Sequence, residues 1–287
     1  MQTRCSVVIP TFNAAHLIGR QLEALAKQTM VAPFEIIVAD NGSTDDLSDV
    51  LDAWANRLPY LRRVDASRAR GVSVARNVGI AAARSDHILV CDADDEVCPE
   101  WVESLVEALS DYGLVGGPVE TRSLSGPAAS WVPIEDEADA LPTFGQVAYP
   151  YGGNTGMRRS VFDSVGGYDE DYPAGAEEID FAWRAAAKGI KAHFVPTAIL
   201  HYRIRTDLRG VVRQQYNSGR GTARLVSKVC SDRDRGKSWP RRIHHELVLL
   251  GRFPWRGGRD ARRAWLTVVA FEIGKLVESQ RLGIPAP

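Results

Sequence analysis

The stretch HILVCDADDE, His87–Glu96, decides the fold, because an apolar run ends there in a cluster of acidic residues. A run that is apolar at every position is typical of a parallel strand with helices on both faces. Two similar runs precede it, Ser6–Ile9 (SVVI), which ends at Pro10, and Glu35–Asp40 (EIIVAD). The three runs predict buried parallel strands of one sheet.

Between these runs, apolar residues recur at helical spacing. Leu17, Ile18, Leu22 and Leu25 mark one helical face, and further helices are expected over residues 47–55, 72–83 and 99–109. Weaker strands are expected at Leu61–Asp65 and Leu114–Val119. This alternation predicts an α/β fold with a mostly parallel twisted sheet flanked by helices.

The second half of the chain gives a weaker pattern. Residues 123–150 are rich in Pro, Ala, Gly and acidic residues, which predicts a loop-rich insertion. A helix is expected over 177–188 and a last strand over 193–202. Beyond Arg203, basic helices are expected, broken at 231–240 and at 254–258.

Composition and charge bound the class of protein. The 287 residues are 45% hydrophobic and 25% charged, which is typical of a soluble globular chain. The four cysteines have no metal-like spacing, so we expect free thiols in a reducing compartment. No apolar run approaches the roughly 20 residues of a membrane span, and no secretory signal is visible. We therefore expect a cytoplasmic protein.

The net charge of −1 conceals a strong asymmetry. Residues 203–287 contain 19 Lys and Arg against 7 Asp and Glu, whereas residues 1–202 contain 16 against 29. A basic carboxy-terminal region of this kind suggests an anionic partner.

Polar tips follow the three best strands. They are Pro10-Thr11-Phe12-Asn13, Asp40-Asn41-Gly42-Ser43 and Asp92-Ala93-Asp94-Asp95. Because ligands of such sheets bind at the carboxyl ends of the strands, these tips predict a binding site. Two carboxylates one residue apart in a turn could hold a divalent cation, although a solvated acidic turn would look the same.

Six segments, in this order, resemble family 2 glycosyltransferases of the GT-A fold. They are VVIPTFN (Val7–Asn13), IIVADNGSTDD (Ile36–Asp46), GVSVARNVGIAAAR (Gly71–Arg84), DADDE (Asp92–Glu96), GGNTGMRRSVFDSVGGYDE (Gly152–Glu170) and EEIDFAWR (Glu177–Arg184). The resemblance covers about residues 5–203. It implies a GT-A domain over 1–203, with a nucleotide-binding half (1–120) and an acceptor and catalytic half (121–203). Residues 204–287 would form a basic helical extension.

The resemblance also implies the donor site. Asp40 would hydrogen-bond the base, which suits uracil, thymine or guanine, with UDP favoured. Asp92 would contact the ribose, Asp94 would ligate Mn²⁺ or Mg²⁺ at the diphosphate, and His201 would add a metal or phosphate contact. The full set expected around the nucleotide is Pro10, Thr11, Phe12, Asn13, Asp40, Gly42, Arg76, Asn77, Asp92 and Ala93.

The family's catalytic carboxylate aligns with Glu178, which would deprotonate the acceptor hydroxyl in an inverting displacement. The family usually has Asp at this position, so the extra methylene puts the position of the base in doubt, and Glu177 and Asp180 are rivals. Gly152, Gly153 and Asn154 match the loop beside the acceptor, which would be a glycan, a glycolipid or a small molecule.

Three alternatives stay open. A sugar nucleotidyltransferase would want a glycine-rich basic loop after the first strand, but no glycine occurs there before Gly19. A non-catalytic module that binds sugar nucleotides or glycans would share the site. The carboxy-terminal region could be a helical lid or a peripheral membrane contact, since its aromatic residues interleave with arginines. These are Trp239, Phe253, Trp255, Trp265 and Phe271. No nucleic-acid recognition module is visible.

Overall fold

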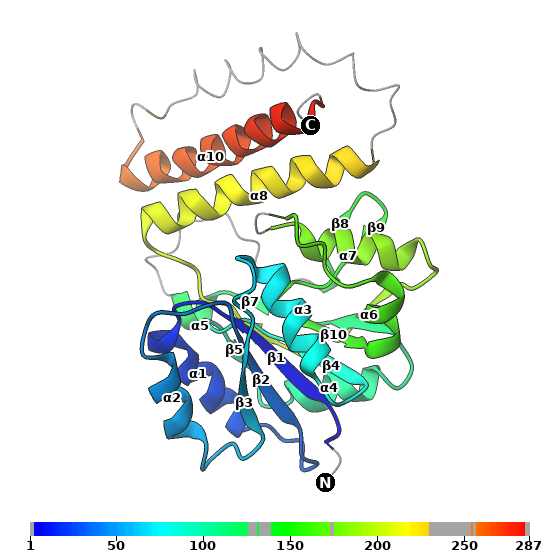
Figure 1. Cartoon of the computed structure of the whole chain (residues 1–287). Coiled ribbons are helices and arrows are strands. Elements are labelled where there is room, and N and C mark those ends of the chain that lie inside the picture. The colour runs from blue at the N-terminus through cyan, green and yellow to red at the C-terminus, as the bar shows by residue number, and fades with distance from the viewer. Residues whose placement is uncertain are drawn as a thin grey trace. The chain divides into compact units, whose positions relative to one another are not determined.

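The computed structural model describes residues 3–125, 131, 139–172, 175–229, 254 and 257–284. The chain forms two compact units. The first comprises Met1–Leu124, Glu135–Glu170 and Glu178–Arg203, and the second comprises Ser125–Ile134, Asp171–Glu177 and Ile204–Pro287. Figure 1 shows the elements of both units along the chain.

A seven-stranded sheet forms the centre of the first unit, in the order β11-β6-β10-β4-β1-β2-β3. The strands are β1 (Ser6–Thr11), β2 (Glu35–Asp40), β3 (Leu61–Asp65), β4 (His87–Val90), β6 (Leu114–Gly116), β10 (Thr155–Arg158) and β11 (Ala192–Phe194). The neighbours β4, β1, β2 and β3 are parallel, as predicted. No strand was predicted at β10, which is antiparallel to both β4 and β6.

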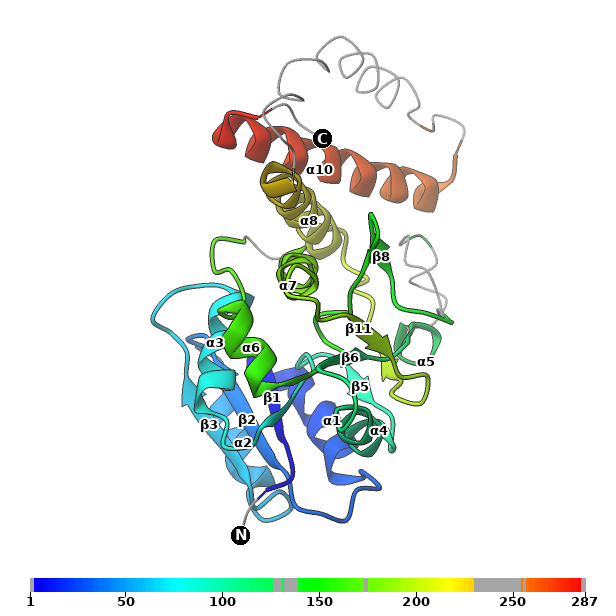
Figure 2. The same cartoon turned by 90° about the vertical axis from the view of Figure 1, so that its right-hand side faces the viewer.

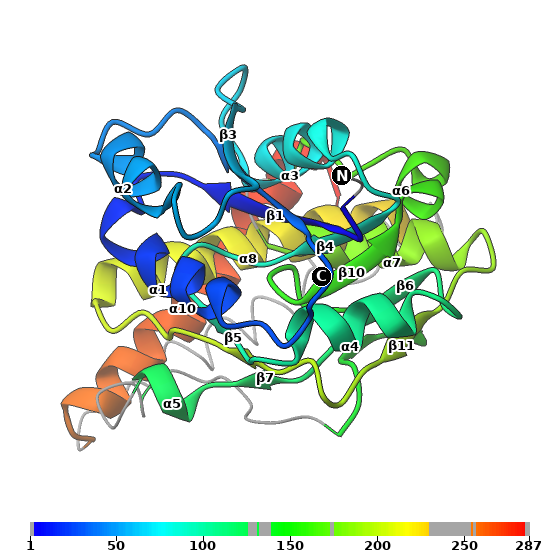
Figure 3. The same cartoon turned by 90° about the horizontal axis from the view of Figure 1, so that it is seen from below.

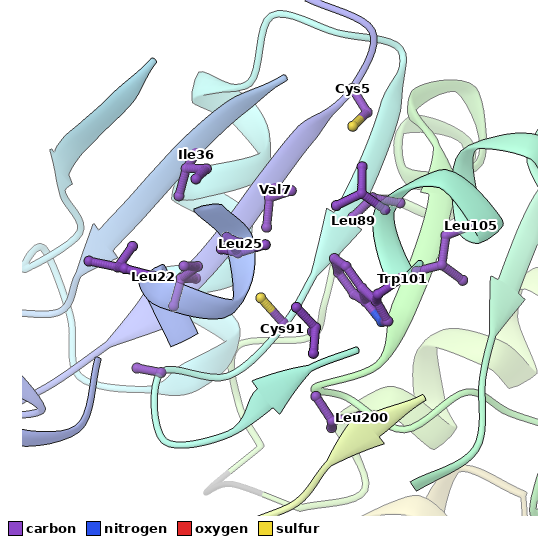
Figure 4. Packing of buried hydrophobic residues seen from close by; sticks show 14 of the residues in the cluster. Cys5, Val7, Leu22, Leu25, Ile36, Leu89, Cys91, Trp101, Leu105 and Leu200 are labelled. Atoms are coloured by element: carbon purple, nitrogen blue, oxygen red, sulfur yellow. The ribbon is translucent and has the colours of Figure 1, made fainter. Parts of the chain in front are cut away.

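Side chains of the central strands alternate between two cores. Val7, Ile9 and Leu89 pack with α1 (Ala15–Ala26), α2 (Leu47–Trp54) and α4 (Trp101–Ala108) on one face. Figure 4 shows this cluster around Trp101. Val8 and Val90 pack on the other face with three further helices. These are α3 (Val72–Ala82), α6 (Arg159–Val165) and α7 (Glu177–Ala186). Seen from below, α4 and α3 lie on opposite sides of the sheet (Figure 3).

The strand expected over 193–202 is two strands in different sheets. β11 ends at Phe194, residues 195–198 make a turn closed by the Ala198 N–H donating to the Val195 carbonyl, and β12 (Leu200–His201) follows. Pro196 stands in the turn, and proline cannot donate to a sheet ladder. β12 pairs with β5 (Glu96–Val97) and with β7 (Val119–Glu120), which places His201 beside Glu96 and Glu120.

Asn154, expected in the acceptor loop, is fully buried and joins three segments of the first unit. Its Oδ1 accepts the Trp101 indole N–H at 2.7 Å, and its Nδ2 donates to the Pro118 and Ala198 carbonyls at 3.0 Å each. The amide therefore has a packing role here. Gly153 is buried as well, so Gly152 is the residue of the predicted acceptor loop that is partly exposed.

Asn154→Ala is expected to destabilise the protein by about 3 kcal/mol, because three buried polar groups lose their partner at once. Urea unfolding followed by tryptophan fluorescence measures this. Thr197→Ala is the matched control, since it removes an exposed hydrogen bond to Ser104 and is expected to cost less than about 0.5 kcal/mol. Equal stability of the two variants would contradict the assigned role.

The second unit is built on two long helices, α8 (Leu208–Val229) and α10 (Arg259–Leu282), which lie side by side (Figures 1 and 2). A Cβ added at Gly219 would lie 2.0 Å from the Phe271 carbonyl oxygen, and one at Gly274 would lie 2.0 Å from the Tyr216 oxygen. The backbones therefore touch at two points where only glycine fits.

Ion pairs fix the same helix pair. Glu278 of α10 has no exposed surface, and Arg220 and Arg224 of α8 donate to its two carboxylate oxygens at 2.9 and 3.3 Å. Among the residues with described positions, no helix has both the length and the apolar character needed to cross a bilayer. Trp239, Phe253 and Trp255 lie outside the described residues, whereas Trp265 and Phe271 are half-buried on α10.

Candidate active site

The tips of β1 and β2 are tied together by side chains from both. Asn13 has a left-handed backbone (φ 51°), its N–H donates to Ser43 Oγ at 2.9 Å, and its Oδ1 accepts the Thr44 N–H at 2.8 Å. Left-handed conformations suit Asn better than most residues. The side chain predicted to line the nucleotide thus builds the rim of the site. Phe12 beside it is 50% exposed and lies under the Arg70 guanidinium at 4.2 Å.

Asp40, the predicted contact of the base, is buried at the end of β2. Its Oδ1 accepts the Ser43 N–H at 2.8 Å, and its Oδ2 accepts Arg63 Nε at 3.0 Å. Burial alone would raise the pKa of Asp40, but the hydrogen bonds from Ser43 and Arg63 outweigh it and lower the pKa below its usual value. Asp40 is therefore an anion at neutral pH. Its Oδ2 accepts from both Nε and Nη2 of Arg63, so Oδ1 is the oxygen with room for a further donor.

Arg76 and Asp92, both predicted for the donor site, are paired. Arg76 is buried in α3, and its Nη2 donates to Asp92 Oδ1 at 3.3 Å. Gly152 and Gly153 cover this pair. A Cβ at Gly152 would lie 2.7 Å from Arg76 Nη2, and one at Gly153 would lie 2.8 Å from Asp92 Oδ2. Two predicted sites, the donor site and the glycine loop, therefore meet at one point.

Gly153→Ala is expected to displace Asp92, because its new methyl group would overlap a carboxylate oxygen. We expect nucleotide affinity to fall about tenfold, and isothermal titration calorimetry with UDP or GDP measures it. Gly19→Ala in α1 is the matched control, because the nearest atom to its new Cβ is 4.0 Å away. Wild-type affinity of Gly153→Ala would show that the contact does not shape the site.

Asn77 makes a different contact from the one predicted. Its Nδ2 donates to the Tyr168 carbonyl and to Glu170 Oε1, both at 2.8 Å, and its Oδ1 accepts the Tyr168 N–H at 2.9 Å. The amide thus fixes the loop before residue 170. The predicted contact of Asn77 with the nucleotide has no support in this geometry.

The acidic turn after β4 is held from two sides by residues that sequence reasoning missed. Gln21 of α1 has no exposed surface, and its amide donates to the Asp92 carbonyl at 3.2 Å and accepts the Val97 N–H at 3.0 Å. Arg203 donates from its N–H to Asp95 Oδ1 at 2.8 Å and from Nε to the Asp94 carbonyl at 2.9 Å. The role of Gln21 could have been predicted from its position, because it is a polar residue within the apolar stripe of α1.

Asp95 is the most deeply buried carboxylate of the turn, with 1% of its surface exposed. Its Oδ2 has no hydrogen-bond partner. Burial raises the pKa of Asp95 well above its usual value, and the charges of Asp94 and Asp92 raise it further. Crowded carboxylates with an unsatisfied oxygen fit a divalent cation. Within the described ranges, however, no three His, Cys, Asp or Glu side chains converge on one point, so a cation would also need ligands from a substrate.

His201 is oriented by Glu120. Its Nδ1 lies 2.8 Å from Glu120 Oε2. Burial would raise the pKa of Glu120, but hydrogen bonds from His201 and Ser123 outweigh it and keep the pKa below its usual value. The ionised carboxylate can only accept, so Nδ1 carries a proton, and in the neutral form of the ring Nε2 has the lone pair that a metal needs. The single strand predicted at Leu114–Val119 is two strands in different sheets, β6 and β7, and Glu120 lies in β7, opposite His201 of β12.

Three carboxylates at the start of α7 were candidates for the base. Glu177 and Asp180 are buried, with 4% and 2% exposed, and Glu178 is half-buried. Glu177 Oε2 accepts the Gly175 N–H, and Asp180 Oδ2 accepts Arg184 Nε at 2.7 Å. Burial raises the pKa of Tyr149 to about 12, and the negative charge of Glu178 contributes. Glu178 therefore lies near the segment that leads to Gly152 and Gly153.

The model of glycosyl transferase family 2 matches residues 6–166 of this chain, more than half of its length. The chain belongs to this family. A second model, glycosyl transferase family group 2, matches residues 87–259. The matched range of the first model includes the strand tips, the acidic turn and the glycine loop.

Relatives of known name support the family. The chain is 28% identical over 224 residues to a validoxylamine A glucosyltransferase of Streptomyces hygroscopicus, covering 64% of this chain and 52% of that protein. It is 39% identical over 109 residues to the glycosyltransferase YibD of Escherichia coli, covering 38% and 31%. A chondroitin synthase of Pasteurella multocida is 26% identical over 223 residues, covering 64% and 23%. The chain thus spans about half or less of these relatives.

Solved structures confirm the fold. A mannosyltransferase of Pyrobaculum calidifontis, in complex with GDP-Man and Mn²⁺, matches with a TM-score of 0.63 at 19% identity, covering 98% of this chain and 85% of that one. Residues 1–349 of TarS from Staphylococcus aureus, in complex with UDP, match with a TM-score of 0.56 at 15% identity, covering 97% and 91%. The chain has the GT-A glycosyltransferase fold, with a helical carboxy-terminal region.

Proposed function

We propose that this family 2 glycosyltransferase is inverting and metal-dependent, and moves a sugar from a nucleoside diphosphate to an acceptor hydroxyl. The observation that carries the proposal is the buried Arg76–Asp92 pair under Gly152 and Gly153, at the start of the acidic turn. It brings the predicted donor residues and the predicted acceptor loop to one place. Glycan, polysaccharide or glycolipid synthesis is the role we infer, since relatives include a chondroitin synthase.

The nucleotide would bind across the tips of β1, β2 and β4. Asp40 is an anion there whose Oδ1 can accept a further hydrogen bond, which suits the ring N–H of uracil, thymine or guanine. Asp92 would accept from the ribose while Arg76 holds its other oxygen. The structural neighbours bind GDP-Man and UDP, so both bases are candidates, and we favour UDP.

A divalent cation would be held by Asp94 and His201 together with the phosphates of the donor. The Glu120–His201 hydrogen bond presents Nε2 as a ligand, and the crowded carboxylates of the turn favour positive charge. Mn²⁺ or Mg²⁺ bound there would neutralise the negative charge that develops on the leaving diphosphate.

Glu178 would act as the base. Its carboxylate takes the proton of the acceptor hydroxyl as that oxygen bonds to the anomeric carbon. The bond from this carbon to the phosphate oxygen breaks in the same step, and its electron pair leaves with the nucleoside diphosphate. A single in-line displacement inverts the configuration at the anomeric carbon. Glu178 is favoured over Glu177 and Asp180 because it is the most exposed of the three.

A thermal-shift panel with UDP, GDP, dTDP and CDP, each with and without Mn²⁺, tests the donor site. We expect one nucleotide to raise the unfolding temperature only when Mn²⁺ is present. Release of that nucleotide from its sugar conjugates in the presence of acceptors then tests transfer. No stabilisation by any nucleotide would overturn the donor site. Stabilisation without turnover on any donor and acceptor pair would favour the non-catalytic module.

A further inference from the structure

One face of α10 carries apolar side chains that contact water. Leu266, Ile273 and Val277 are 38%, 47% and 41% exposed, and their spacing of seven and four residues places them in one stripe along the helix. Half of the large hydrophobic side chains that are exposed among the described residues belong to this one helix. We call these three residues the α10 stripe.

Arginines extend the α10 stripe at both ends. Arg259 and Arg262 precede Leu266 by seven and four residues, Arg281 follows Val277 by four, and all three are exposed. These spacings place the arginines on the same face as the stripe. The acidic residues of α10, which are Asp260, Glu272 and Glu278, lie off this face at other helical positions.

The helices of the second unit whose residues the structure describes are strongly basic. Together α8 and α10 carry ten Lys and Arg residues against three Asp and Glu residues. One of the three acids, Glu278, is buried between Arg220 and Arg224, and Glu272 is paired with Lys275 at 2.7 Å. The two helices together therefore carry an excess of positive charge.

We propose that α10 docks the protein on an anionic membrane surface. The helix would lie in the plane of the interface, with the α10 stripe among the upper acyl carbons and the flanking arginines at the lipid phosphates. Apolar residues in the middle and cations at the ends of one helical face match that arrangement. This inference does not rest on sugar transfer, because it uses only the second unit.

A second copy of the chain fits the stripe less well. Two stripes packed face to face would bring the arginines of both helices together, and like charges repel. Three side chains also bury far less than the roughly 800 Å² per partner of a stable protein interface. An anionic bilayer satisfies both the apolar and the basic part of the face.

Co-sedimentation of the full chain with vesicles tests the proposal. We expect binding to phosphatidylcholine vesicles that contain about 30% phosphatidylglycerol, and weaker binding to phosphatidylcholine alone. Replacing Leu266 and Ile273 together by aspartate is expected to lower the bound fraction at least about tenfold. Replacing Arg259 and Arg262 by glutamate is expected to remove the preference for the anionic vesicles.

Val31→Asp is the matched control, because Val31 is 99% exposed in the first unit and its replacement is expected to leave binding unchanged. Circular dichroism checks that each variant is folded, and nucleotide binding is measured separately, so a failed donor site leaves this test intact. Absence of wild-type binding, or equal binding of the Leu266 and Ile273 variant, would overturn the proposal. A dimer that this variant dissociates in sedimentation velocity would assign the stripe to a second copy instead.

Discussion

Asp94→Ala is expected to abolish the Mn²⁺-dependent binding of the nucleotide. Asp94 stands in a turn whose neighbours are already engaged, since Asp92 is paired with Arg76 and Asp95 accepts from the Arg203 N–H. The remaining oxygen, Asp95 Oδ2, has no partner but belongs to a side chain with 1% of its surface exposed, so we expect it not to replace the Asp94 carboxylate. Titration calorimetry of the preferred nucleotide with Mn²⁺ should show a loss of affinity of more than about 100-fold.

Asp111→Ala is the control for Asp94→Ala, because Asp111 is an exposed aspartate outside the acidic turn. It should bind nucleotide like the wild type. Binding without metal should differ little between Asp94→Ala and the wild type, since the base and ribose contacts remain. Unchanged Mn²⁺-dependent affinity of Asp94→Ala would remove Asp94 from the proposed cation site.

Glu178→Gln is expected to retain donor binding and to lose sugar transfer. The amide has nearly the shape of the carboxylate but cannot accept the proton of the acceptor hydroxyl. General-base catalysis contributes about 10²- to 10⁴-fold, so we expect transfer to fall at least about 100-fold. Steady-state transfer rates and titration calorimetry with the donor separate the two effects.

Glu177→Gln and Asp180→Asn are the matched variants for Glu178→Gln. Both residues are buried and already accept hydrogen bonds. Glu177 accepts the Gly175 N–H, and Asp180 accepts Nε of Arg184. We expect these variants to lower stability more than transfer. If Glu178→Gln transfers sugar at the wild-type rate, the base has to be sought at Glu177 or Asp180.

The sequence predicted the strands that are buried on both faces of the sheet. β1, β2 and β4 are apolar on both faces because helices cover both, and their carboxyl tips meet at one edge as expected. β10 was missed because Thr155–Arg158 is short and has no apolar run, and only its position between β4 and β6 makes it a strand. Its pairing partners are distant in the sequence, so no local pattern predicts them.

The sequence predicted candidate residues for the site, but not which of them contact one another. Asp92 and Gly153 were both expected there, but their contact depends on the return of the chain after residue 150. The roles of Asn77 and Asn154 could not be predicted from the sequence. A side-chain amide can hydrogen-bond a ligand, or it can join two loops with the same atoms, as both residues do here. Only the positions of distant carbonyl groups decide between these uses.

The glycine contacts between α8 and α10 also determine how the second unit can vary. Because Gly219 and Gly274 let main chain touch main chain, neither position tolerates even one added carbon unless the other helix shifts. Any change that moves α8 would therefore rotate or translate α10 with it. The direction in which Leu266, Ile273 and Val277 face is thus encoded as much in α8 as in the helix that carries them. Homologues that differ at either glycine should differ in that direction too.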